Sequence, residues 1–198
     1  VSPPPLGVGG LLVAVVRYSK MALVCCFGIA LGGVSAEVPV NATKNNVNAA
    51  LAQAEVVGIY FTPPSDVAAA VIQVIDQSQS EVLVQAYGFT HNGIAQALLR
   101  AHARGVQVKV LLDAKTDSTN RYVTELLQAE QIPLRLDGGH AIAHNKVIVV
   151  DSELVITGSF NFTNSAQTRN AENLLILKSS GLADSYKSNW QTHWNHSR

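Results

Sequence analysis

From residue 56 onward, the chain alternates short runs of Val, Ile and Leu with segments whose apolar residues recur at helical spacing. Such alternation arises when strands are joined by helices that cross back over a sheet. The strand runs are apolar at nearly every position, which indicates that both faces of the sheet are buried. We therefore expect an α/β fold with a mostly parallel or mixed sheet, flanked by helices on both faces, in one domain over residues 56–198.

The individual elements follow from the same pattern. The expected strands are rich in β-branched residues and cover Val56–Phe61, Glu81–Phe89, Val106–Leu112, Ile132–Leu136, Val147–Val150, Leu154–Thr157 and Leu174–Lys178. The expected helices have apolar residues three and four positions apart and cover Asp66–Ser78, Ile94–Arg104, Ser118–Glu130 and Leu182–Trp194. Ser65 can cap the first helix and Gly105 can end the second. Tyr186, Trp190 and Trp194 share one face of the last helix, which we interpret as packing.

Residues 1–36 have the order of an export signal. Arg17 and Lys20 precede the apolar stretch Met21–Leu31, and small residues follow as far as Ala36. This order predicts cleavage after Ala36 and export to the periplasm or the medium, with an uncleaved anchor as the alternative. Residues 37–55 are interpreted as a polar lead-in, and it stays open whether residues 1–20 belong to the natural protein.

The charge balance limits the partners of the chain. The 198 residues carry 14 basic and 14 acidic side chains, so the formal net charge is zero. Arg17 and Lys20 are the charged residues of the signal, so the remaining chain has a net charge of −2. This argues against a strongly basic nucleic-acid coat but leaves room for a local basic site. The 47% hydrophobic and 14% charged content excludes a disordered, charge-rich chain.

His144 and Lys146 stand two residues apart at the start of an expected strand, so their side chains should share a face. Burying an imidazole and an ammonium without a partner would cost several kcal/mol, and a binding site explains the pair better. Histidine can act as a nucleophile or proton carrier near neutral pH, and the lysine offers a positive charge for an anion.

A second group follows the next strand. Ser159 and Asn161 offer neutral donors, Gly158 permits close backbone approach, and Glu172 lies further along. With His144 and Lys146, these residues predict a cradle for a tetrahedral anion, for which phosphate fits best. No acidic cluster suited to magnesium lies near them in the sequence, and both cysteines fall within residues 1–36. We therefore expect neither a metal nor another cofactor, with charge neutralised by the lysine and the neutral donors.

The other histidines are interpreted more simply. His140 and His144 are four residues apart, but a Gly-rich turn precedes them and a strand follows, so a metal-binding pair on one helix is disfavoured. His140 is placed at the substrate entrance. His193 and His196 are interpreted as surface positions of the last helix. Three basic residues could contact a nucleic-acid backbone or be solvated surface charges: Lys115, Arg121 and Arg169.

The spacing H-x-K-x4-D-x6-G-S-x-N, which begins at His144 and includes Asp151, resembles the signature of the phospholipase D superfamily. The resemblance runs from about residue 56 to the C-terminus and is strongest to the short, exported bacterial nucleases with one motif copy. The segments Tyr87–Thr90 and Gly158–Thr163 and the Trp-containing last helix are similar too.

The resemblance implies a role for each residue. His144 would attack phosphorus and form a phosphohistidine, while Lys146, Ser159 and Asn161 would hold the non-bridging oxygens. Glu172 would orient the histidine, as a carboxylate does in a triad. Asp151 would be structural, and so would Gly158. Because the mechanism uses two histidines and this chain has one motif, a symmetric homodimer sharing one active site is implied.

The expected function is therefore a metal-independent phosphodiesterase, most simply an endonuclease that cleaves DNA, and RNA besides, without sequence preference. Nothing in the chain resembles a base-reading helix. A phospholipase D acting on phospholipid headgroups is the alternative, since both substrates present the same phosphodiester. Short length and the lack of an amphipathic membrane-binding segment after residue 36 favour the nuclease, whereas the net charge of −2 weighs against it. A catalytically inactive binding module is disfavoured by the intact motif.

Overall fold

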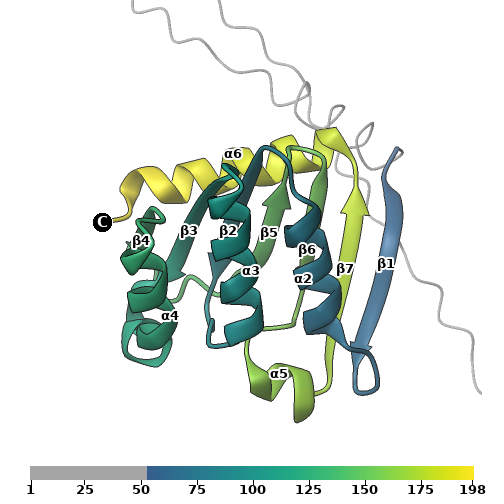
Figure 1. The fold of residues 1–198 in the computed structure, drawn as a ribbon, viewed down its shortest axis with the longest axis horizontal. Coiled ribbons are helices and arrows are strands. Elements are labelled where there is room, and N and C mark those ends of the chain that lie inside the picture. Colours follow the sequence, from purple (N-terminus) through teal and green to yellow (C-terminus); the bar gives the residue numbers. More distant parts are fainter. Residues whose placement is uncertain (1–52) are drawn as a thin grey trace, which may run out of the picture. The chain divides into compact units, whose positions relative to one another are not determined.

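A computed structural model describes residues 53–198. The expected signal, residues 1–36, and nearly all of the lead-in lie outside the described residues. Seven strands form one sheet in the order β1-β7-β6-β5-β2-β3-β4 (Figure 1). The strands are β1 Glu55–Thr62, β2 Glu81–Ala86, β3 Gln107–Asp113, β4 Leu134–Asp137, β5 Lys146–Val150, β6 Leu154–Gly158 and β7 Glu172–Lys178. The α-helices are α2 Val67–Gln77, α3 Asn92–Ala103, α4 Asp117–Ala129, α5 Asn164–Thr168 and α6 Ser180–His196, and a 3₁₀ turn covers Ala114–Thr116.

The sheet is mixed, which confirms the expected α/β fold, and parallel pairing is confined to β2, β3 and β4. The remaining pairings, β1 with β7, β2 with β5, β5 with β6 and β6 with β7, are antiparallel. The tight turn between β5 and β6 makes their pairing antiparallel, because parallel neighbours need a long crossover. Asp151 and Ser152 in this turn have φ values of 54° and 52°, and the Glu153 amide donates to the Val150 carbonyl at 3.0 Å.

Helices cover both faces of the sheet. Helices α2, α3 and α4 lie on one face and α6 crosses the other (Figure 1). Alternate strand residues therefore enter two cores, so that Val84 packs toward α2 and α3 while Leu83 packs toward α6. This double burial accounts for the continuously apolar strand sequences.

The aromatic stripe of α6 packs against the sheet, as predicted. Trp190 is buried and its indole N–H donates to the Val84 carbonyl at 2.9 Å. The Trp194 ring stacks on that of Trp190 at 4.8 Å between centroids, and Tyr186 packs against the same core. The side chain of Arg135 on β4 lies over the Trp194 ring at 4.7 Å.

Two local features differ from the sequence-based expectations. Ser65 was expected to cap α2, but Asp66 is the N-cap and accepts from the Ala69 amide at 3.0 Å. The Ser65 hydroxyl accepts from the Phe61 amide instead, so it is used by the preceding turn. Helix α5 was not expected, because five residues are too few to show helical periodicity. Thr163 caps this helix by accepting from the Ala166 amide at 3.1 Å.

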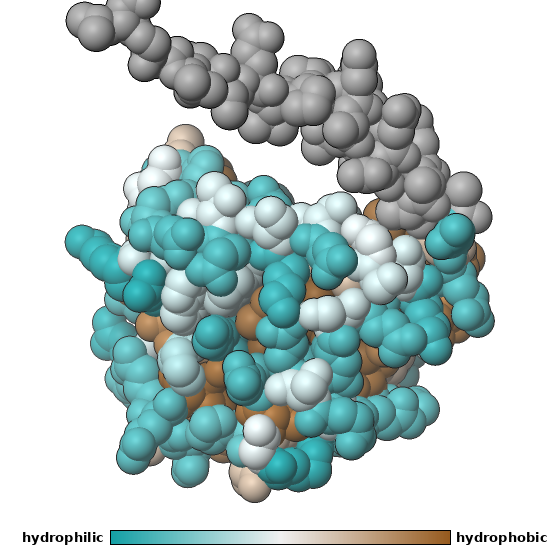
Figure 2. Space-filling view, turned by 90° about the horizontal axis from the view of Figure 1, so that it is seen from above, coloured by the Kyte–Doolittle hydropathy of each residue, from teal (hydrophilic) through white to brown (hydrophobic). Residues whose placement is uncertain are grey.

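Within residues 53–198, none of the helices combines the length and apolarity needed to cross a bilayer. Figure 2 views the molecule from above relative to Figure 1, and hydrophilic side chains dominate the coloured part of that face, with apolar ones visible between them.

Candidate active site

The order of the strands brings the motif residues together at one end of three neighbouring strands. Strand β5 begins at Lys146, its antiparallel neighbour β6 ends at Gly158, and the next strand β7 begins at Glu172. Because antiparallel strands place the start of one beside the end of the next, these positions share an edge of the sheet. It is the edge next to α5 in Figure 1. Ser159 and Asn161 follow β6 at this edge, and His144 precedes β5.

The imidazole of His144 is exposed, whereas Lys146 is 7% exposed. The Lys146 ammonium donates to the His144 carbonyl at 3.0 Å. The ring of Tyr87 lies 4.6 Å from the His144 ring and 5.3 Å from the Lys146 ammonium. A cation near an aromatic face is attracted by its quadrupole, by about 0.5–2 kcal/mol. Thus an accessible imidazole is held beside a largely buried positive charge.

Burial lowers the pKa of the Lys146 ammonium, and the nearby negative charge of Glu172 acts to raise it, leaving the pKa below its ordinary value. An ammonium with one hydrogen bond to a carbonyl still has protons to donate. An anion placed at this edge would regain part of the solvation that burial has removed from the ammonium.

Glu172 is tied to the segment on either side of it. The Ser159 hydroxyl donates to Glu172 Oε2 at 2.5 Å, and the Asn170 side-chain amide donates to Oε1 at 2.9 Å. The Asn173 amide donates to the Ser159 oxygen at 3.1 Å. The structure therefore joins Ser159 and Glu172 directly. The expected role of Glu172 in orienting His144 stays a prediction.

Asn161 and Gly158 shape the turn after β6. Asn161 Oδ1 accepts from the Gly88 amide at 3.3 Å, which links this turn to the segment after β2. Gly158 has φ +154°, and a Cβ placed there would lie 2.3 Å from the Asn173 carbonyl oxygen. A side chain at residue 158 is therefore sterically incompatible with the approach of β6 to β7.

Asp151 lies at the opposite end of β5, where its carboxylate accepts from the backbone amides of Gln79, Ser80 and Glu81 and from the Ser80 hydroxyl. Burial acts to raise the pKa of this carboxyl, but these hydrogen bonds outweigh burial and the pKa lies below its ordinary value. The carboxylate holds the turn between β5 and β6 against the start of β2.

The other candidates fall into two groups. Lys115, Arg121 and Arg169 are exposed, and their contact with nucleic acid stays a prediction. His193 and His196 were interpreted as surface positions, and this was wrong for His193, whose side chain is 15% exposed. Both rings hydrogen-bond to the Asp137 carboxylate, because the end of α6 lies against β4.

Two site residues were not assigned from the sequence. Tyr87 contacts both His144 and Lys146, and Asn170 holds Glu172. The similarity of the segment Tyr87–Thr90 to the family was the sequence feature that pointed to Tyr87. Asn170 offered no signal in the sequence. In the fold its carbonyl accepts at 3.1 Å from the hydroxyl of Thr62, which lies 108 residues away in the chain.

A histidine–lysine pair, a hydroxyl, an amide and a carboxylate thus lie together at one end of three neighbouring strands of a mixed sheet. Residues 71–194 match the family described as "Cardiolipin synthase, PLD-like domain", and the chain belongs to this family within the phospholipase D superfamily.

Three relatives show how far the similarity extends. The phospholipase D of Rickettsia bellii (strain RML369-C) is 45% identical over 130 residues, which are 66% of this chain and 65% of the relative. The chain thus spans slightly less than two thirds of that relative. The crystal structure of Nuc, a phospholipase D family member from Salmonella typhimurium, has a TM-score of 0.71 and 35% identity over 74% of this chain and 97% of Nuc. The mitochondrial cardiolipin hydrolase of Xenopus tropicalis is 29% identical over 60% of this chain and 56% of that protein.

Proposed function

We propose that this protein is a metal-independent phosphodiesterase that cleaves DNA internally without sequence preference, with RNA as a further substrate. The exposed imidazole of His144 beside the buried ammonium of Lys146 carries this proposal. A nucleophile open to solvent can reach the phosphate of a polymer, and a buried cation can neutralise the charge that develops there.

In the proposed reaction, a ring nitrogen of His144 bonds to phosphorus as the bond to the leaving oxygen breaks. That oxygen takes its proton from the partner subunit's His144. The same partner imidazole then accepts a proton from water, whose oxygen attacks phosphorus and displaces His144. Lys146, Ser159 and Asn161 hold the non-bridging oxygens in both steps, which requires Ser159 to turn its hydroxyl from Glu172 toward the substrate.

The site supports chemistry without a divalent cation. Glu172 is the carboxylate that the motif brings in, and its two oxygens already accept from Ser159 and Asn170. It also lies within electrostatic reach of the Lys146 ammonium, which would repel a second cation placed there. The positive charge needed by the transition state is therefore assigned to Lys146.

A shared site in a symmetric homodimer is part of the proposal. The described chain supplies one H-x-K motif, and the proposed reaction needs two imidazoles. Exposure of His144 leaves its ring available to a phosphate held between two subunits. We also propose export of the protein with removal of residues 1–36, which N-terminal sequencing of protein recovered from the periplasm or medium would test.

Cleavage of phospholipid headgroups is the second candidate function, favoured by the names phospholipase D and cardiolipin hydrolase among the relatives. The name Nuc points to a nuclease, the first candidate function, and the match covers nearly all of the Nuc chain. The phosphodiester chemistry is the same in both, so the substrate must be distinguished by experiment.

The deciding experiment offers both substrates to the same enzyme in excess EDTA, with circular dichroism recording that the protein stays folded. Supercoiled plasmid and phosphatidylcholine vesicles are incubated separately with the wild-type protein and with His144→Ala. Plasmid cleavage without choline release, lost in the variant, supports the proposed nuclease. Choline release without plasmid cleavage would instead establish the phospholipase, and activity in His144→Ala would remove this histidine from the mechanism.

A mixing experiment tests the shared site. Wild-type protein is equilibrated with an equal amount of His144→Ala so that subunits exchange. Nuclease activity is then compared with that of the wild type alone at the same total concentration of subunits. If both imidazoles serve one phosphate, only wild-type pairs are active and activity falls to about one quarter, whereas independent sites retain about one half. If light scattering showed that the active protein is a monomer, the shared site would also be contradicted.

A further inference from the structure

A second group of histidines surrounds a buried carboxylate. The Asp137 side chain is inaccessible to solvent, and three imidazoles face it. Asp137 Oδ2 lies 2.7 Å from His193 Nδ1, and Oδ1 lies 3.0 Å from His196 Nε2 and 3.4 Å from His140 Nδ1. The Gly139 amide also donates to Oδ1 at 3.0 Å. The ligand atoms that these four side chains can offer all lie within 4.8 Å of one another.

Three separate parts of the chain meet here. Asp137 is the last residue of β4, His140 lies in the connection to β5, and His193 and His196 lie in the last turn of α6. The rings are also in contact with each other, with centroids 4.7 Å apart for His140 and His193 and 5.3 Å apart for His193 and His196. Three imidazoles from two separate parts of the chain are therefore gathered around one carboxylate.

Hydrogen bonding alone explains this group poorly. Asp137 Oδ1 alone would have to accept from His140, His196 and the Gly139 amide, although one carboxylate oxygen offers only about two lone-pair sites. A divalent cation at the centre would instead be bound by three neutral imidazoles and an ionised carboxylate at the same time.

We propose that Asp137, His140, His193 and His196 form a four-coordinate site for one Zn²⁺ ion. Imidazole and carboxylate are ligands that zinc accepts in tetrahedral geometry at about 2.0–2.2 Å, which requires ligand atoms roughly 3.3 Å apart. The widest separation in the cluster is 4.8 Å, so the group must contract by about 1.5 Å on binding. His140 and His196, whose side chains are 46% and 37% exposed, have room to make this movement.

The ion would be structural, with four protein ligands and no position left for a substrate. It would join the end of β4 to the last turn of α6, which already meet through the Arg135 guanidinium and the Trp194 carbonyl at 2.7 Å. His140 lies four residues before His144, so the ion would also restrain the segment that carries the proposed nucleophile. This role is separate from the metal-independent chemistry proposed above.

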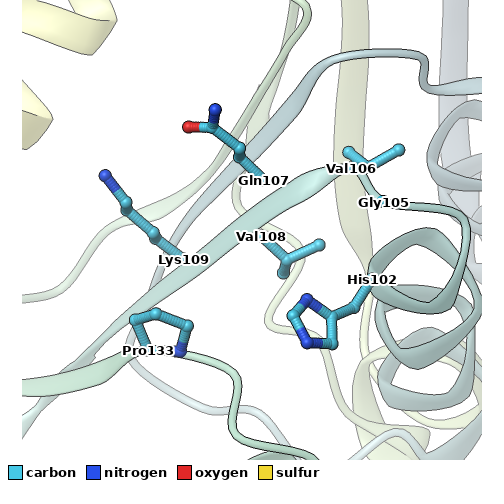
Figure 3. A pocket seen from close by; sticks show the side chains of 7 residues that line it. All are labelled: His102, Gly105, Val106, Gln107, Val108, Lys109 and Pro133. Carbon is cyan, nitrogen blue, oxygen red and sulfur yellow. The ribbon is translucent and has the colours of Figure 1, made fainter.

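His102 provides a matched control histidine. It lines a shallow pocket of about 270 Å³ with residues that include Gly105, Val108, Lys109 and Pro133 (Figure 3). The residues that line this pocket include no carboxylate and no second imidazole. Replacing His102 removes one imidazole from the protein without touching the proposed site.

The test uses full-length protein without a polyhistidine tag, stripped with chelator and then freed of it. Zinc is added in excess, loosely bound metal is removed by gel filtration, and bound zinc is measured by mass spectrometry. We expect His102→Gln and His144→Ala to bind as much zinc as the wild type, and the double variant His193→Gln with His196→Gln to bind one equivalent less. The comparison also corrects for any zinc held by Cys25 and Cys26.

Two further measurements test the geometry and the structural role. Cobalt(II) added in place of zinc should give the intense visible absorption of a four-coordinate ion in the wild type and not in the double variant. Zinc should raise the melting temperature of the wild type by several degrees, because the ion binds the folded chain. If the double variant fails to fold, His140→Gln replaces it.

Equal zinc content in the wild type and the double variant would overturn the proposal, and so would loss of the equivalent in His144→Ala, which would move the metal to the active site. Absence of zinc from all variants would leave the cluster as a hydrogen-bonded group only and would equally overturn it.

Discussion

The ring of Tyr87 lies 4.6 Å from the ring of His144, inclined to it by 60°. The same tyrosine ring lies 5.3 Å from the Lys146 ammonium, so one aromatic side chain contacts both members of the H-x-K pair. Tyr87 follows β2 and the pair lies at the start of β5, and the Tyr87 amide donates to the Asn145 carbonyl at 2.9 Å. The position of the proposed nucleophile thus depends on the neighbouring strand.

Removing the ring at residue 87 should impair turnover more than removing its hydroxyl. Tyr87→Phe keeps the ring contacts with His144 and Lys146, and we expect a change in kcat of no more than about twofold. Tyr87→Ala removes both contacts, and a loss of about 1–2 kcal/mol corresponds to roughly a 5- to 30-fold lower kcat. Steady-state kinetics on the preferred substrate checks this, and equal kcat in the two variants would refute the positioning role.

Neutralising Glu172 should shift the alkaline limb of the pH profile. Lys146 must be protonated to hold a phosphate, and the Glu172 charge raises a Lys146 pKa that burial has lowered. Glu172→Gln removes the raising effect, so the Lys146 pKa falls and activity should decline at a lower pH than in the wild type. The dependence of kcat/KM on pH measures this shift. An unchanged or higher alkaline limb would contradict the electrostatic coupling of these two residues.

A methyl group at residue 158 should destabilise the fold. The Cβ of Gly158→Ala would lie 2.3 Å from the Asn173 carbonyl oxygen at a φ of +154°, so the β6–β7 pairing must shift. We expect a loss of at least about 2 kcal/mol in the free energy of unfolding. Gly138→Ala is the control, because its Cβ would meet the Ala114 methyl at an ordinary 3.7 Å. Urea denaturation of both variants gives the comparison, and equal stability would show that the strands tolerate the contact.

Asp151→Asn should weaken the fold at neutral pH and less so in acid. The carboxylate accepts several hydrogen bonds, so its loss should cost about 2 kcal/mol at neutral pH. Its pKa is lowered in the folded protein, so its contribution is complete above the unfolded value of about 3.9 and is lost as the pH falls through the folded value. Denaturation across this range should show the two proteins converging below about pH 4. A gap that stays constant would indicate a role unrelated to charge.

The sequence was sufficient for those features that local patterns determine. Apolar periodicity located β5, β6 and α6, and the fixed spacing from His144 to Asn161 gave the site its candidate residues. The short helix α5 was not predicted, because its five residues are too few to show helical periodicity.

Features that depend on contacts between distant segments could not be predicted in this way. Asp137 and His193 are 56 residues apart in the chain, and only the packing of α6 against β4 brings them together. Tyr87 reaches His144 because β2 and β5 are neighbours, a strand order that the β2–α3–β3 pattern does not reveal. The antiparallel part of the sheet was underestimated for the same reason.

The spacing within H-x-K-x4-D has a physical length. Lys146 begins β5 at the edge where reaction is proposed, and Asp151 follows its last residue at the far edge, bonded to the amides before β2. The four residues between them are the buried interior of one strand. Inserting a single residue there would reverse which side chains face each way, so that the cation and the anchoring carboxylate could not both keep their partners. The interval between lysine and aspartate in the motif therefore equals the length of strand β5. A chain that keeps both residues but changes their separation could not place the cation at one end of this strand and the anchoring carboxylate at the other.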